Sequence, residues 1–96
     1  MLLVDPNHLV IVKNILAKYP HKFCVFGSRT KGNPKRYSDL DICIMDEIKD
    51  LELSYIEDEF ENSDLPFKVD LIVWNNISDE FKDIIRNDLS DLIINK

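Results

Sequence analysis

Two short β-prone runs, residues 40–45 and 67–74, are separated by an acidic segment whose apolar residues recur at helical spacing. A strand, helix and strand in this order form a right-handed crossover, which makes the two strands parallel. A third β-prone run, residues 22–26, ends at Gly27 and returns through a loop that is too short for a crossover. We therefore expect it to be antiparallel to residues 40–45, which predicts a small mixed sheet.

Helices are expected before and after these strands in the sequence. Asp5 followed by Pro6 is typical of a helix start, and this helix should end near Pro20. Ser78 should cap a last helix, whose apolar stripe would comprise Phe81, Ile84, Ile85, Leu89, Leu92 and Ile93. That stripe could pack into the core or stay partly uncovered as a docking face. With a short helix after Gly27, the prediction is an α/β (α+β) fold with three strands, about four helices and the order αβαβαβα.

Composition limits the class of protein. The 96 residues, of which 45% are hydrophobic, suit a single domain spanning 1–96, and no apolar run is long enough to cross a membrane. Cys24 and Cys43 lie in apolar strand-like runs, which favours reduced thiols and a cytoplasmic location. A net charge of -6 argues against direct nucleic-acid binding and fits a basic protein partner better.

Three aspartates are candidates for chemistry. Asp39 and Asp41 open the run at residues 40–45 and, because side chains alternate along a strand, project from one face about 6 to 7 Å apart. Parallel pairing would place Asp70 beside Asp41 if the register of the two strands matches. Carboxylates this close repel one another unless cations compensate, and oxygen ligands suit Mg²⁺. Asp70 could instead be a half-exposed edge residue or an ion-pair partner of Lys68.

The turn after residue 26 could bind phosphate. Gly27 allows close approach of the backbone to a ligand, and the Ser28 hydroxyl and nearby N–H groups can donate to phosphate oxygens. The following loop, residues 28–37, contains four basic residues and no acid. It is either a solvated loop or a phosphate clamp, and Arg29 could equally pair with an acid of the segment at 50–60.

These residues together resemble the signature of the nucleotidyltransferase superfamily that includes DNA polymerase β. Gly27-Ser28, a ten-residue spacer, Asp39-Leu40-Asp41-Ile42 and a later Asp70 are the matching positions. The resemblance is closest to the minimal nucleotidyltransferases of prokaryotes, and it spans nearly the whole chain. Lys31 stands where that family commonly has arginine, which keeps the charge but loses bidentate phosphate geometry.

The resemblance implies a mechanism and a partner. Asp39, Asp41 and Asp70 would be catalytic and would hold two Mg²⁺ ions, while Gly27, Ser28 and Arg29 would bind the nucleotide. The activity implied is transfer of AMP from ATP to a hydroxyl, on a tyrosine of a HEPN-domain ribonuclease toxin, so that the chain acts as an antitoxin. Two alternatives remain open, namely a non-catalytic antitoxin that neutralises its partner by stoichiometric binding, and a small-molecule nucleotidyltransferase.

Overall fold

The chain alternates helices and strands in the order that the sequence predicts. The computed structural model describes residues 4–27 and 39–92. Within these ranges the elements are α1 (Pro6–Leu16), β1 (Phe23–Phe26), β2 (Leu40–Ile44), α2 (Asp50–Glu61), β3 (Val69–Val73), η2 (Trp74–Asn76), α3 (Asp79–Ile85), η3 (Arg86–Asp88) and β4 (Ser90–Asp91). The short helix expected after Gly27 lies outside the described residues.

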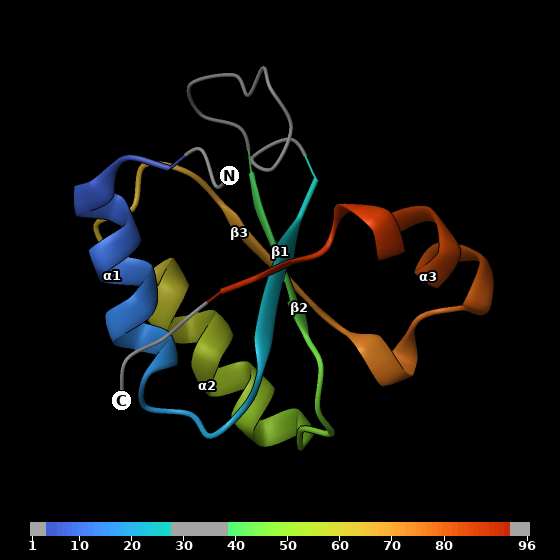
Figure 1. The fold of residues 1–96 in the computed structure, drawn as a ribbon. Helices are drawn as coiled ribbons and strands as arrows, with labels where there is room; N and C mark the ends of the chain where they lie inside the picture. Colours follow the sequence, from blue (N-terminus) through green and yellow to red (C-terminus); the bar gives the residue numbers. More distant parts are fainter. Residues whose placement is uncertain (1–3, 28–38, 93–96) are drawn as a thin grey trace.

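The strands form a mixed sheet in the order β3-β2-β1-β4 (Figure 1). β1 and β2 are antiparallel, whereas β2 and β3 are parallel and connected through α2. The mixed α+β architecture predicted from the sequence is therefore confirmed. The prediction of three strands is wrong, because β4 adds a fourth among the described residues by pairing antiparallel to the free edge of β1.

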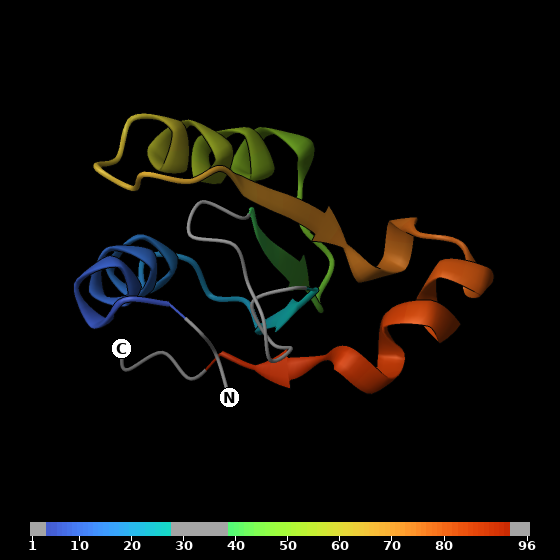
Figure 2. The same cartoon turned by 90° about the horizontal axis from the view of Figure 1, so that it is seen from above.

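The two faces of the sheet carry separate apolar clusters. On one face, Leu40, Ile42 and Ile44 of β2 pack with residues of α1 and α2, including Leu16 and Ile56, and all five are fully buried. The other face carries a smaller cluster. It contains Phe26, Cys43 and Ile85. Figure 2 shows this division, with α1 and α2 together on one side of the strands and α3 on the other.

The last helix is much shorter than its apolar stripe predicts. α3 does begin after Ser78, whose hydroxyl accepts a hydrogen bond from the Phe81 N–H at 3.2 Å, but it ends at Ile85. The Leu92 N–H donates to the Phe23 carbonyl at 3.0 Å, so this segment satisfies backbone groups on the edge of β1. Sheet pairing and the burial of Leu92 in the larger cluster thus prevail over helical spacing. Ile93 lies outside the described residues.

Polar contacts join the link between α1 and β1 to α2. The Tyr19 hydroxyl donates to Glu59, and together with burial this raises the pKa of Tyr19 to about 12. His21 Nε2 lies 2.5 Å from Glu52 Oε1. Sequence reasoning assigned no role to His21, because its partner lies 31 residues away. These contacts help to hold the two helices on the same face.

The two cysteines lie opposite each other on β1 and β2. Cys24 is the register partner of Cys43, and both are unbridged and buried. Burial raises the pKa of each thiol to about 11, so both remain protonated at neutral pH. Within the described part of the chain, no helix is long and apolar enough to cross a membrane.

Candidate active site

The first two candidate carboxylates stand at the start of β2. Asp39 directly precedes the strand and is exposed, whereas Asp41 lies within it and is half-buried. Leu40 and Ile42 point into the cluster under α1 and α2. Since side chains alternate along a strand, Asp41 projects from the opposite face, beside the buried Cys43.

The parallel register brings Asp70 next to Asp41. β2 and β3 pair with Asp41 opposite Asp70, one step beyond the pair of Leu40 and Val69. The sequence alone left this register open, and the structure places the two carboxylates side by side on one sheet face. The alternative interpretation of Asp70, as an edge residue or an ion-pair partner of Lys68, also agrees with the structure. β3 is an outer strand, and Lys68 Nζ lies 3.3 Å from Asp70 Oδ1.

The electrostatics of Asp41 reflect this crowding. Burial raises the pKa of Asp41 above its ordinary value, and the charges of Asp70 and then Asp39 raise it further. The negative charges of Asp70 and Asp39 therefore act on the Asp41 carboxylate. A site with such a concentration of negative charge is stabilised when a cation binds.

Gly27 is required by the position of the Asp41 carboxylate. Its φ of +83° lies in the left-handed region, which residues with a side chain rarely adopt. A Cβ atom at this position would lie 2.4 Å from Asp41 Oδ2, far inside van der Waals contact. The cause is the antiparallel register, in which the preceding residue, Phe26, pairs with Asp41. Sequence reasoning linked Gly27 to phosphate but missed this contact, which depends on the pairing of β1 with β2.

Two of the three predicted nucleotide-binding residues, Ser28 and Arg29, lie outside the described residues, as does Lys31. Their roles stay predictions from the sequence. Of the predicted phosphate-binding turn, the structure describes Gly27.

The donor set fits a hard divalent cation that is also held by substrate. Among the residues that the structure describes, no group of three His, Cys, Asp or Glu side chains is arranged to hold a metal ion by itself. Mg²⁺ commonly takes only one or two carboxylates from the protein, together with phosphate oxygens and water. The neighbouring carboxylates of Asp41 and Asp70 match that requirement, and Asp39 is available at the exposed end.

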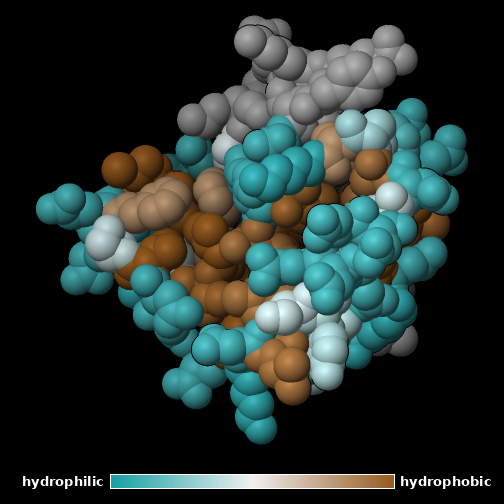
Figure 3. All heavy atoms as spheres, turned by 180° about the vertical axis from the view of Figure 1, so that it is seen from behind, coloured by the Kyte–Doolittle hydropathy of each residue, from teal (hydrophilic) through white to brown (hydrophobic). Residues whose placement is uncertain are grey.

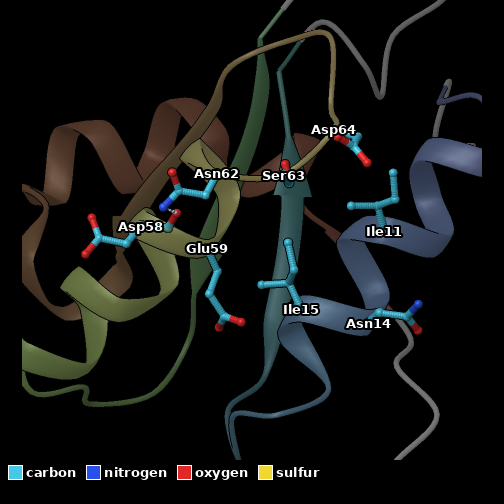
Figure 4. A pocket seen from close by; sticks show the side chains of 8 residues that line it. All are labelled: Ile11, Asn14, Ile15, Asp58, Glu59, Asn62, Ser63 and Asp64. Carbon is cyan, nitrogen blue, oxygen red and sulfur yellow. Dashed lines mark hydrogen bonds between the residues drawn. The ribbon is translucent and has the colours of Figure 1, made fainter.

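A separate cavity lies between α1 and α2, on the other side of the sheet from these carboxylates. It has a volume of about 480 Å³ and is lined by Ile11, Asn14, Ile15, Asp58, Glu59, Asn62, Ser63 and Asp64. Figure 4 shows side chains from both helices facing this space. The helices cover the sheet face opposite Asp41, so the cavity is not part of the carboxylate site.

The outer side of β3 is only partly covered. Val69, Asp70, Leu71 and Ile72 are all half-buried, in contrast to the buried centre of β2. Figure 3 shows the molecule from behind, where hydrophobic residues gather in the middle of the face and hydrophilic residues surround them. Asp70 thus lies on a strand that solvent can reach.

Comparison with known proteins agrees with this geometry. Residues 9–95 match the family described as nucleotidyltransferase domain. The chain is also 41% identical over 87 residues to a protein of Haemophilus influenzae (strain ATCC 51907 / DSM 11121 / KW20 / Rd) named "Probable protein adenylyltransferase MntA". That match covers 86% of this chain and 76% of the relative. A sheet face with adjacent carboxylates beside a left-handed glycine, together with these matches, shows that the chain belongs to the nucleotidyltransferase domain family and is an enzyme of that type.

Proposed function

We propose that this nucleotidyltransferase is a Mg²⁺-dependent protein adenylyltransferase, which transfers AMP from ATP to a tyrosine hydroxyl of a HEPN-domain toxin and so acts as its antitoxin. The pairing of Asp41 with Asp70 is the observation that carries the proposal, because it concentrates negative charge where a metal-bound triphosphate would be held. The relative named as a protein adenylyltransferase supports the choice of a protein acceptor.

The reaction replaces the phosphoanhydride bond between the α- and β-phosphates of ATP by a phosphodiester bond to the acceptor. The acceptor hydroxyl loses its proton to water, and its oxygen forms a bond to the α-phosphorus of ATP. The bond between that phosphorus and the oxygen bridging to the β-phosphorus breaks, and pyrophosphate leaves with the electron pair. Two bound Mg²⁺ ions would lower the pKa of the attacking hydroxyl and neutralise the charge of the departing pyrophosphate. This displacement needs positioning and charge compensation more than covalent participation by the protein.

Each residue of the site has a role in this scheme. Asp39 and Asp41 would hold the cations together with the triphosphate, and Asp70 would complete the site near the attacking hydroxyl. The missing Cβ of Gly27 leaves room for the Asp41 carboxylate and lets the adjoining backbone approach a phosphate. Ser28 and Arg29 would donate to phosphate oxygens, and Lys31 would add positive charge.

The charge of the whole chain supports a basic protein as acceptor. The chain carries 18 acidic and 12 basic residues, and α2 bears acids at several exposed positions. Complementary charge speeds the association of two proteins and orients them. The unbridged cysteines fit a cytoplasmic setting, in which both proteins would meet ATP.

A transfer assay tests this function. The chain is incubated with a HEPN-domain protein, sought among the products of neighbouring genes, and with α-labelled ATP and Mg²⁺. Label on that protein is measured together with its ribonuclease activity. We expect label on a tyrosine and loss of ribonuclease activity. The double variant Asp39→Asn, Asp41→Asn should abolish both the labelling and the neutralisation. Asp64→Asn is the same chemical change at a residue that lines the cavity with α1 and α2 residues, and it should preserve both.

The same assay separates the alternatives. Full neutralisation by the double variant, without label, would show that the chain acts by stoichiometric binding. Labelling of an added small hydroxyl compound in place of the partner would show a small-molecule nucleotidyltransferase. Either result would overturn the proposed function.

A further inference from the structure

A lysine shares the sheet face of the three aspartates. The Leu40 N–H donates to the Lys68 carbonyl at 2.9 Å, so the pairing of β2 with the chain leading into β3 continues back to Lys68. Lys68 and Asp70 are two residues apart, which places both side chains on the same face. Lys68 Nζ lies 3.3 Å from Asp70 Oδ1.

The four charged residues form two neighbouring pairs. Asp41 and Asp70 are register partners one step after Leu40 and Val69, and Asp39 and Lys68 directly precede the two strands. The face therefore presents three carboxylates and one ammonium group within two rows. Among the residues that the structure describes, Lys68 is the basic residue with an ion pair to one of the three aspartates. The ion pairs of Lys18, Lys22, Lys82 and Arg86 involve other acids.

The ion pair of Lys68 is easily exchanged. The Lys68 side chain is 73% exposed and that of Asp70 is 39% exposed, so water screens their attraction. Exposed pairs of this kind contribute little to stability, and breaking one requires little free energy. A divalent cation has twice the charge of an ammonium group and competes well for the same carboxylate oxygen.

We propose that Lys68 is a positioning residue of the nucleotidyl transfer site, an exchangeable counter-cation that holds the Asp70 carboxylate while no metal is bound. This inference rests on the proposed function, since it requires a divalent cation at Asp70. Binding of that cation displaces the ammonium group from Asp70 Oδ1. Because Lys68 occupies the oxygen and repels the incoming ion, it raises the concentration of divalent cation needed to fill the site.

Direct metal binding tests the proposal without any turnover. Mn²⁺ binding to the full chain is titrated by electron paramagnetic resonance, without nucleotide, at constant pH and low salt. Lys68→Met keeps the length of the side chain and removes its charge, and we expect it to tighten Mn²⁺ binding about fivefold. Lys68→Arg should bind as the wild type does. The difference in Mn²⁺ affinity between Lys68→Met and the wild type should be smaller at high salt, because salt screens exposed charges.

Lys22→Met is the matched control. Lys22 is 62% exposed and its Nζ lies 3.7 Å from Asp91 Oδ1, so this variant removes the same charge from a similar ion pair away from the cluster. It should leave Mn²⁺ affinity unchanged, and the urea midpoint of each variant shows that the fold is kept. Equal Mn²⁺ affinity of wild type and Lys68→Met would overturn the role of Lys68 while leaving the proposed function intact. No Mn²⁺ binding by any of these proteins, either alone or with a non-hydrolysable ATP analogue, would overturn both.

Discussion

At the scale of single residues, the site depends on the close packing of Gly27 against Asp41. The glycine has a backbone conformation that disfavours other residues, and its missing side chain gives space to a carboxylate oxygen. Asp41 in turn is held in a half-buried position beside other negative charges. In the absence of a cation, the charge of Asp41 therefore lowers the stability of the fold, and such a cost is common at active sites.

Replacing Gly27 by alanine should destabilise the fold and displace the Asp41 carboxylate. A left-handed residue with a side chain costs about 1 to 3 kcal/mol, and the contact with Asp41 adds to this. Urea denaturation measures the loss. In an Asp41→Ala background the contact is absent, so Gly27→Ala should cost measurably less there, and an equal cost in both backgrounds would contradict the steric explanation.

Asp41→Asn should stabilise the protein in the absence of metal. The native pKa of Asp41 is raised, so the native state binds more protons than the unfolded state, and stability falls as pH rises from the unfolded pKa through the native one. Asparagine carries no charge, so the stability of the variant does not fall in this way as pH rises. Its free energy of unfolding should be about 1 kcal/mol higher than that of the wild type at pH 7. The gain should disappear in acid, where Asp41 is protonated in both states. Urea denaturation from pH 3 to pH 8 provides the comparison, and a gain independent of pH would argue against a charge effect.

At the scale of secondary structure, α2 determines where Asp70 lies. It connects β2 to β3 and packs onto the sheet through Ile56 and Phe60, which are both buried. The crossover makes the strands parallel, and the packing of α2 holds β3 in the register that pairs Asp70 with Asp41. The position of the carboxylate is thus a property of an entire strand, helix and strand unit.

Ile56→Ala tests the contribution of α2. Ile56 is 0% exposed, and truncation of a fully buried isoleucine usually costs about 2 to 5 kcal/mol because it leaves a cavity. Leu51→Ala on the same helix is the control, since Leu51 is 64% exposed and should cost less than about 0.5 kcal/mol. Urea denaturation of both variants gives the comparison. Similar costs for the two would contradict the packing described for this helix.

At the scale of the whole molecule, the carboxylate site and the main core lie on opposite faces of one sheet. The larger apolar cluster beneath α1 and α2 stabilises the fold, whereas the other face carries the charged residues at one end and a small apolar cluster with α3. A ligand that neutralises the charged face should therefore stabilise the entire chain. The arrangement separates the parts of the molecule that stabilise the fold from those that bind the substrate.

Mg²⁺ together with a non-hydrolysable ATP analogue should raise the melting temperature. At ten times the dissociation constant, binding to the native state adds about 1.4 kcal/mol. For a chain of this length that corresponds to about 5 to 10 °C, which scanning calorimetry resolves easily. The double variant Asp39→Asn, Asp41→Asn should show no shift. An equal shift in this variant would place the binding site elsewhere on the molecule.

The sequence by itself determined the local elements and the residue types of the site. Caps at Asp5 and Ser78, helical spacing from residue 50 and alternation in residues 40–44 are local signals, and each appears in the structure as expected. The Asp39 and Asp41 pair follows from alternation alone. These features depend on neighbours within a few residues, which is why the sequence could predict them.

Only the tertiary structure decided how distant residues meet. The register that pairs Asp41 with Asp70, the approach of Gly27 to Asp41 Oδ2 and the ion pair of Lys68 all depend on how strands align. The end of the chain shows the same dependence, because residues with helical spacing form β4 where the edge of β1 offers hydrogen bonds. Distant segments compete to pair with the same backbone groups. The periodicity within one segment does not show which of them will pair.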